Sequence, residues 1–260
     1  MKSTLDKWGV KGRVKSIHHK KFDVERIGTN KPNIIEDVTS NDFVTFNQKG
    51  FIIKRKNFEV DLKFYYKISE NEFTVHEHGE NNKVIEIGKC TINENGDDLQ
   101  YLRYSSDEIC YDERTYKYNK KGNLIQENLC NSEGNLVEYL FYEYNGCSSL
   151  QKLREFMFGE EWRVTKYRYN LNDDFTEDVV EKKILYLDEN NKSSSYTVKY
   201  KYDTDRNVIS EQYLDEFKFI TNTYTLSWFF DIHDNWVKKV AYKGGKEAWF
   251  EERTILYYGN

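Results

Sequence analysis

The sequence predicts an all-β protein: an antiparallel meander of repeated hairpins that forms a curved single sheet or a partly closed barrel. The first observation behind this is composition. The 260-residue chain has 21 Tyr, 16 Phe and 5 Trp, but only two alanines, Ala241 and Ala248, and one proline, Pro32. Strand-favouring residues are abundant, whereas the best helix former is nearly missing. Recurring turn signals and strict alternation between them are the second and third observations.

A turn template recurs along the chain. Aromatic residues at alternate positions precede Asn or Asp, and a Gly or Asn and a large apolar residue follow. The clearest copies are Tyr116–Leu124, Tyr200–Val208 and Trp228–Trp236. Asn or Asp opens a turn through its side chain, and Gly accepts the left-handed backbone of a tight loop. Where the first copy has Gly122, the others have Arg206 and Asp234, so we expect a positive φ there at some energetic cost.

The segments between these turns alternate with a period of two. Tyr196, Val198 and Tyr200 oppose Thr197 and Lys199, which predicts strands with one buried and one solvated face. The segment 136–144 is apolar on both faces, which predicts a strand that is covered on two sides.

Two segments lack the clear alternation of the strands above. Leu150, Leu153 and Met157 fit one face of a helix. Alternation and a turn signal at 159–161 favour instead a strand over 153–158 followed by a second strand over 162–169. The weakly periodic region 29–42 is predicted to be a loop. The whole chain, 1–260, is predicted to be a single β domain.

The repeated units resemble tyrosine–aspartate (YD) repeats of the rearrangement-hotspot type. The similarity extends over 111–145 and 196–258, and the stretch Asp231–Trp236 is similar to the closing segment of small stand-alone bacterial YD-repeat proteins. In large members such repeats form a curved shell around a toxic enzyme domain. The resemblance implies a bacterial protein of the small type, which has no established reaction. Here the repeats are few and unevenly spaced, which favours an open or rolled meander over a closed shell.

No arrangement of residues indicates catalysis. His76 and His78 share a strand face but lack a third ligand at a recognisable spacing. Three of the acidic pairs 97–98, 160–161, 173–174 and 251–252 fall at or near predicted turns, and solvation at turns is taken to explain the pairs. Ser193–Ser195 lacks a nucleophile elbow. No phosphate-binding loop is present. We therefore expect no enzyme activity, no catalytic residues, no metal and no cofactor.

Location and partners follow from composition. The 39 basic and 44 acidic residues give a net charge of −5, so we expect no nucleic-acid partner. No apolar stretch is long enough for a membrane helix or a leader, which predicts a cytoplasmic protein without a membrane partner. Four cysteines without a C-x-x-C pair are expected to be free thiols, although two disulfides stay open if a leader was removed.

These observations favour a non-catalytic protein-binding or scaffold protein. Its partner is expected to be another protein, and neutralising or chaperoning a toxin is the specific form that the resemblance implies. The expected interaction surface comprises Tyr65, Tyr139, Trp236 and Trp249, since exposed aromatic residues are common at interfaces. The alternative is a glycan-binding module or carbohydrate-active enzyme that uses exposed Trp and acidic turn residues. A structural surface protein, which would require export, is a third interpretation.

Overall fold

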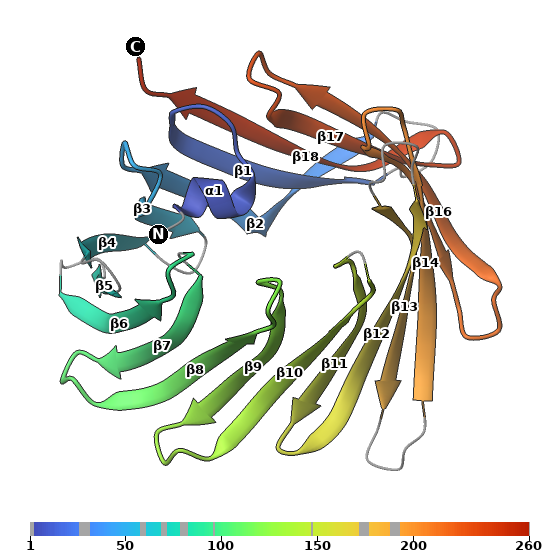
Figure 1. Cartoon of the computed structure of the whole chain (residues 1–260). Coiled ribbons are helices and arrows are strands. Elements are labelled where there is room, and N and C mark those ends of the chain that lie inside the picture. Colours follow the sequence, from blue (N-terminus) through green and yellow to red (C-terminus); the bar gives the residue numbers. More distant parts are fainter. Residues whose placement is uncertain are drawn as a thin grey trace. The chain divides into compact units, whose positions relative to one another are not determined.

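The chain folds almost entirely into β-strands (Figure 1). The computed structural model describes residues 3–25, 32–57, 61–68, 72–78, 83–95, 97–146, 148–171, 177–187 and 193–259. Within these ranges there are 18 strands and one short helix, α1 (Thr4–Trp8). No helix in this part of the chain is long and apolar enough to cross a membrane.

The strands follow one another with short connections. In chain order they are β1 (Val14–Glu25), β2 (Asn33–Phe46), β3 (Ile52–Asn57), β4 (Asp61–Ile68), β5 (Glu72–His78), β6 (Val84–Ile92), β7 (Asp98–Ser105), β8 (Cys110–Tyr118), β9 (Leu124–Asn131), β10 (Leu136–Tyr144), β11 (Leu150–Met157), β12 (Glu160–Leu171), β13 (Glu177–Leu187), β14 (Ser193–Tyr202), β15 (Val208–Leu214), β16 (Ile220–Phe230), β17 (Trp236–Lys243) and β18 (Lys246–Tyr257). Neighbouring strands pair antiparallel, so the predicted all-β antiparallel meander is confirmed.

The chain divides into two compact units. Unit 1 comprises Met1–Asp97, Tyr104–Ile109 and Thr225–Asn260, and unit 2 comprises Asp98–Arg103 and Cys110–Tyr224. In unit 1 the strand order is β17–β18–β1–β2–β3–β4–β5–β6, so the first strand pairs with both the last strand and the second. In unit 2, β8 to β15 pair in sequence order.

Helix α1 packs on one face of unit 1. Leu5 joins a buried cluster with Val14, Ile17, Val44 and Phe46. Burial of these side chains holds the short helix, which could not be stable alone.

A glycine makes the close approach of the first residues possible. The Leu5 N–H donates to the Gly50 carbonyl at 3.2 Å. A Cβ on Gly50 would lie 2.6 Å from Ser3 Oγ, and the φ of Gly50 is +81°, so any other side chain here would displace the N-terminal segment.

The recurring turns form as the template predicts. Asn119 Oδ1 accepts from the N–H groups of Lys121 and Asn123, at 2.9 and 3.0 Å. The φ angles are +81° at Gly122, +66° at Arg206 and +57° at Asp234, so the expected positive φ is confirmed at both substituted positions. The Asp or Asn side chain holds the turn even where glycine is missing.

The two ambiguous segments have different outcomes. Residues 150–157 form strand β11, so the strand was the right choice. The predicted loop over 29–42 is wrong for residues 33–42, which belong to β2, and residues 29–31 lie outside the described part of the chain. Strand β2 pairs along β1, and its acidic side chains lie beside lysines, with Lys20 Nζ 3.0 Å from Glu36 Oε1. Cross-strand charge pairs therefore replace the alternation that marks other strands.

The prediction for 136–144 was also wrong in part. Leu136 and Phe141 of β10 are 45% and 38% exposed, so this strand is not covered on both sides.

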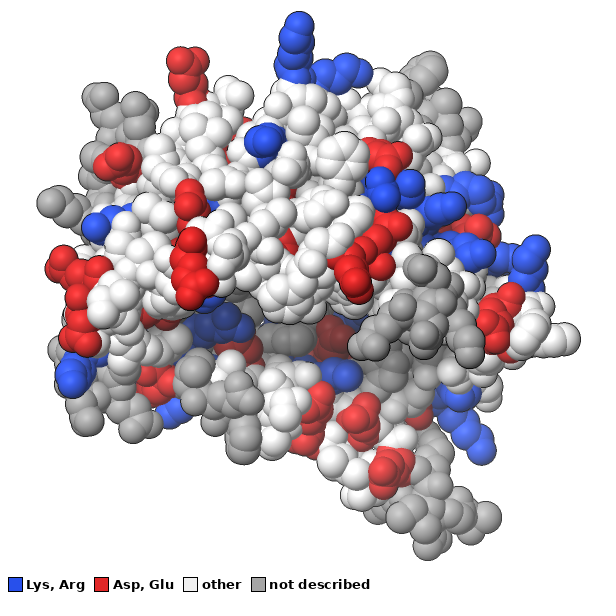
Figure 2. Space-filling model, turned by 90° about the horizontal axis from the view of Figure 1, so that it is seen from below, with Lys and Arg blue, Asp and Glu red and all other residues white. Residues whose placement is uncertain are grey.

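Charged side chains of both signs cover the surface. On the face seen in Figure 2, the described basic and acidic residues are interspersed and do not form one large area of a single sign. This matches the near balance of 39 basic and 44 acidic residues.

Candidate functional site

The strand β18 carries polar and aromatic residues on the sheet face that α1 covers. Trp249, Glu251, Arg253 and Ile255 alternate along β18, and Ile255 packs against the buried cluster beneath α1. Arg253 lies directly opposite His19 of β1. Successive side chains of a strand point to opposite faces, so these four share one face.

A cavity of about 330 Å³ opens on this face within unit 1. Its lining is apolar except for three polar side chains, and comprises Trp8, Val10, Ile17, His19, Asp42, Val44 and Arg253. The volume lies at the lower end of the range for small-molecule sites, roughly 300–1,000 Å³.

Arg253 is a partly buried cation without an anionic partner among the described residues. Its Nε is buried and has no hydrogen-bond partner. Its guanidinium carbon lies 3.5 Å from the centroid of the Trp236 ring, a cation–π contact. Burial lowers the pKa of Arg253 to about 10, although Glu251 acts in the opposite direction. The Nε–H of Arg253 has therefore lost water without gaining a hydrogen-bond acceptor among the described residues.

The acidic groups near the cavity are already engaged elsewhere. Asp42 accepts from Arg55 Nε at 3.1 Å. Glu251 Oε2 lies 3.5 Å from His19 Nε2, although that buried nitrogen has no hydrogen-bond partner among the described residues. That contact lowers the pKa of Glu251, burial raises it, and the charge of Lys239 lowers it, with a net shift below the ordinary value. Arg253 is thus the positive group left to meet an anion.

Tryptophans extend from this face over β16 and β17. The Trp236 ring contacts Trp228 edge-on, with centroids 5.8 Å apart. Lys239 Nζ lies 5.1 Å from the Trp228 centroid and 4.8 Å from that of Trp249. The predicted surface residues Trp236 and Trp249 are therefore half-buried among cations on the same sheet face.

The other two predicted surface residues lie elsewhere. Tyr65 on β4 is 49% exposed, and its ring contacts that of His78 at 4.6 Å. Tyr139, in unit 2, stacks on Phe156 with centroids 4.1 Å apart. A role of these four residues as an interaction surface stays a prediction.

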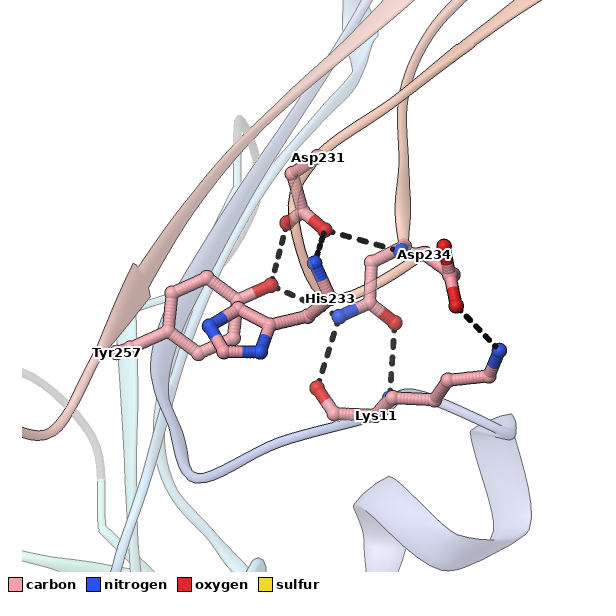
Figure 3. A network of polar contacts seen from close by, with 6 residues as sticks. Lys11, Asp231, His233, Asp234 and Tyr257 are labelled. Atoms are coloured by element: carbon pink, nitrogen blue, oxygen red, sulfur yellow. Dashed lines mark hydrogen bonds and ion pairs between the residues drawn. The ribbon is translucent and has the colours of Figure 1, made fainter.

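A polar network ties the Asp231–Asn235 turn to the segment before β1 (Figure 3). Asn235 Oδ1 accepts from the Lys11 N–H at 2.8 Å, and Asn235 Nδ2 donates to the Lys11 carbonyl and to Tyr257 Oη, both at 2.8 Å. The Tyr257 hydroxyl donates to Asp231, and the His233 ring lies against the Tyr257 ring at 4.2 Å. Asn235 is only 6% exposed. The network fixes the chain between α1 and β1, and so one end of the cavity wall.

The network also sets the charge states of its members. Burial raises the pKa of Asp231, but hydrogen bonds from Tyr257 and from two backbone N–H groups outweigh it and lower the pKa below its ordinary value. Burial and the bond to Asp231 raise the pKa of Tyr257 to about 12. Asp231 is thus a stable anion, and Tyr257 its neutral donor.

Unit 2 carries arginines that do have partners. Arg163 Nε donates to Glu155 Oε1 at 2.7 Å, and its Nη2 donates to Glu155 Oε2. The bond to Glu155 raises the pKa of Arg163 above its ordinary value. Arg114 Nη1 donates to Glu127 Oε1 at 2.6 Å.

The other candidates from the sequence form no centre. Within the described ranges, no group of three or more His, Cys, Asp or Glu side chains could hold a metal ion. His18 and His19 point to opposite faces, because His18 contacts Asn41 whereas His19 contacts Glu251. Cys90, Cys110 and Cys130 form no disulfide. Cys147 and the pair 173–174 lie outside the described residues.

Sequence reasoning did not find the Arg253 cavity. The pair Glu251–Glu252 was assigned to a solvated turn, but it lies within β18, and Glu252 pairs with Lys238 at 2.8 Å. The alternation from Trp249 to Ile255 was the signal that could have revealed a lined face.

Comparison with known proteins found no matching family model and no curated protein that matches in sequence. Among solved structures, a porin-like protein from Bacteroides uniformis is similar with a TM-score of 0.48 and 11% identity, covering 94% of this chain and 98% of that one. A porin-like protein from Bacteroides vulgatus gives 0.41 and 12%, covering 96% and 100%. The Tc holotoxin pore of Photorhabdus luminescens gives 0.25 and 11%, covering 86% of this chain and 16% of that one.

These findings correct the sequence-based assignment. The YD-repeat membership was wrong: no family model matches, and the similar structures that cover nearly the whole chain are porin-like proteins. The same similarity contradicts the protein-binding, scaffold and toxin-neutralising functions and the glycan-binding alternative. It also contradicts the protein or toxin partner, the exclusion of a membrane, and the cytoplasmic location. At these TM-scores the similarity assigns no function to this chain.

Proposed function

We propose that this protein binds a small organic anion with an apolar body in the cavity beneath α1. The carboxylate or similar group pairs with Arg253, and the body packs against Trp8, Val10, Ile17 and Val44. The observation that carries the proposal is the buried Nε of Arg253, which has no partner among the described residues although it borders a cavity.

The chemistry of the guanidinium favours a planar anion. Arginine presents parallel N–H donors that match both oxygens of a carboxylate. A buried charge is costly until it is paired, so an arriving anion recovers the desolvation that Arg253 has already undergone. Because Trp236 covers one face of the guanidinium, the ligand approaches its edge.

The rest of the lining favours an apolar body. Four of the seven lining residues are Trp8, Val10, Ile17 and Val44, and Asp42 is already neutralised by Arg55. Burying an apolar group here contributes roughly 25 cal/mol for each Å² removed from water. The proposal is binding without catalysis.

The experiment is a calorimetric titration with short aromatic and branched carboxylates, each alongside its uncharged amide. We expect the carboxylates to bind and the amides to bind at least about tenfold more weakly, because a bond to a charged group contributes about 1.5–3 kcal/mol. Arg253→Met should abolish this preference. Arg168→Met removes a guanidinium whose side chain is 63% exposed and serves as the matched control. Equal binding of acids and amides, or full binding by Arg253→Met, would contradict the proposal.

A further inference from the structure

One edge of the sheet in unit 2 carries large apolar side chains at its turns. Phe158 is 74% exposed, Phe217 is 71% and Phe219 is 70%. With three neighbours of the same kind they form what we name the apolar edge: Leu136, Met157, Phe158, Phe217, Phe219 and Ile220.

These residues lie on the same side because of the topology. They belong to the connections from β9 to β10, from β11 to β12 and from β15 to β16. In an antiparallel meander, every second connection returns at the same edge. The Phe158 N–H donates to the Val137 carbonyl at 2.7 Å, which places the first two connections side by side.

The described turns at the opposite edge of unit 2 are polar. Their tips carry Lys120 and Lys121 between β8 and β9, and Thr204, Asp205 and Arg206 between β14 and β15. The three most exposed phenylalanines of unit 2 therefore lie at one edge, whereas Phe141, at 38%, lies within β10. Single exposed apolar residues would need no explanation.

The backbone holds the phenyl groups outward. Asp215 Oδ1 accepts from the N–H groups of Phe217 and Phe219, at 3.0 and 2.8 Å. Lys218 between them has a φ of +68°, so the turn is a fixed one with a residue in the left-handed region. A turn held by hydrogen bonds to the Asp215 carboxylate thus presents the two rings to solvent.

From this arrangement we infer that the apolar edge inserts into the surface of a lipid bilayer. Phe158 and Phe217 are separated along the edge by about 19 Å, four strand spacings of about 4.8 Å. Apolar side chains that are carried on separate turns along one edge fit an extended apolar layer better than they fit a single pocket. Aromatic side chains are favoured at the boundary between lipid tails and water, and large exposed apolar patches mark such contacts.

Apolar contact, rather than charge, is expected to contribute most of the free energy of binding to the bilayer. The tips include Glu133, Glu160 and Glu216 besides Lys218, and the charges visible in Figure 2 are mixed in sign. An anionic lipid is therefore not required, and binding should change little with salt. This inference does not depend on the Arg253 cavity.

The test is co-sedimentation of the full chain with phosphatidylcholine vesicles at low and high salt. We expect the parent to bind at both, and Phe217→Ser/Phe219→Ser to bind at least about tenfold more weakly, because two exposed rings no longer leave water. Both rings are exposed, so circular dichroism and the unfolding midpoint should stay unchanged. Ile232→Ser, which removes a 94% exposed apolar side chain from unit 1, is the matched control and should bind like the parent.

Three results would overturn the inference. The first is a parent chain that does not sediment with vesicles, and the second is a double variant that binds as well as the parent. The third is a double variant that only loses concentration-dependent self-association in light scattering, which would assign the edge to contact between copies of the chain.

Discussion

Two arginines, one in each unit, lie against a tryptophan and differ in their second partner. Arg163 in unit 2 lies 4.7 Å from the Trp162 ring and donates twice to Glu155. Arg253 in unit 1 lies 3.5 Å from the Trp236 ring and has no carboxylate among its described hydrogen-bond partners. The pKa values shift in opposite directions, upward for Arg163 and downward to about 10 for Arg253.

The difference separates a structural arginine from one available to a ligand. In unit 2, Glu155 supplies the anion, so the charge of Arg163 is paired within the folded structure. In unit 1, Arg253 borders a cavity, and the carboxylates of Asp42 and Glu251 contact Arg55 and His19. Four experiments test this difference between the two units.

The largest effect is expected in unit 2. Arg163→Met leaves Glu155, whose side chain is 3% exposed, without its partner, and should lower the free energy of unfolding by about 3 kcal/mol. Urea denaturation measures it. The double variant Glu155→Gln/Arg163→Met should recover most of the loss, because no buried charge is then unpaired. A loss below about 1 kcal/mol for the single variant would mean that the pair is not structural.

The next effect concerns two copies of the same turn. Asn235→Ala removes three hydrogen bonds, two of them to the Lys11 backbone, and should cost about 2 kcal/mol. Asn207 stands at the same template position in unit 2, but among the described residues its side chain bonds only Asp203. Asn207→Ala should cost about 1 kcal/mol or less in the same urea assay. Equal costs would show that the bonds to residue 11 add nothing.

Arg253→Met should behave unlike Arg163→Met. It removes a desolvated charge and a cation–π contact whose contributions oppose each other, so the free energy of unfolding should stay within about 1 kcal/mol of the parent. Thermal unfolding without ligand measures this. A loss as large as that of Arg163→Met would place Arg253 among the structural arginines.

The smallest effect is a pH dependence in unit 1. The pKa of Glu251 is lowered in the folded chain, so its contribution is present above its unfolded pKa and is lost as the pH falls through the lower folded value. Between about pH 5 and pH 3, Glu251→Gln should lose less stability than the parent, by less than about 1 kcal/mol. Parallel urea titrations at several pH values measure this, and identical slopes would contradict it.

Local chemistry made the turns and most strands predictable. Asn119, Asp203 and Asp231 each accept backbone N–H groups within their own turn, so the signal lies in a few adjacent residues. Strand β2 was missed because its stability depends on lysines of β1, which the sequence around Glu36 does not reveal.

The cavity could not be predicted from the sequence, for the same reason. The cavity is lined by residues from α1, β1, β2 and β18. Arg253 is distinctive because its buried Nε has no hydrogen-bond partner among the described residues. Neither property has a local pattern. The alternation around Arg253 could predict only which face it occupies.

The pairing of β1 with β18 has a consequence for synthesis of the chain. Val14 of β1 pairs with Tyr257 of β18, so this edge of β1 stays unpaired until nearly the whole chain has emerged, although β2 can pair with its other edge early. Strands β8 to β15 each pair with the strand just made and can close as they appear. Strands β1 to β6 also pair in sequence order and emerge earlier, so they and β8 to β15 can form before the chain is complete, while the wall that holds Arg253 is completed last.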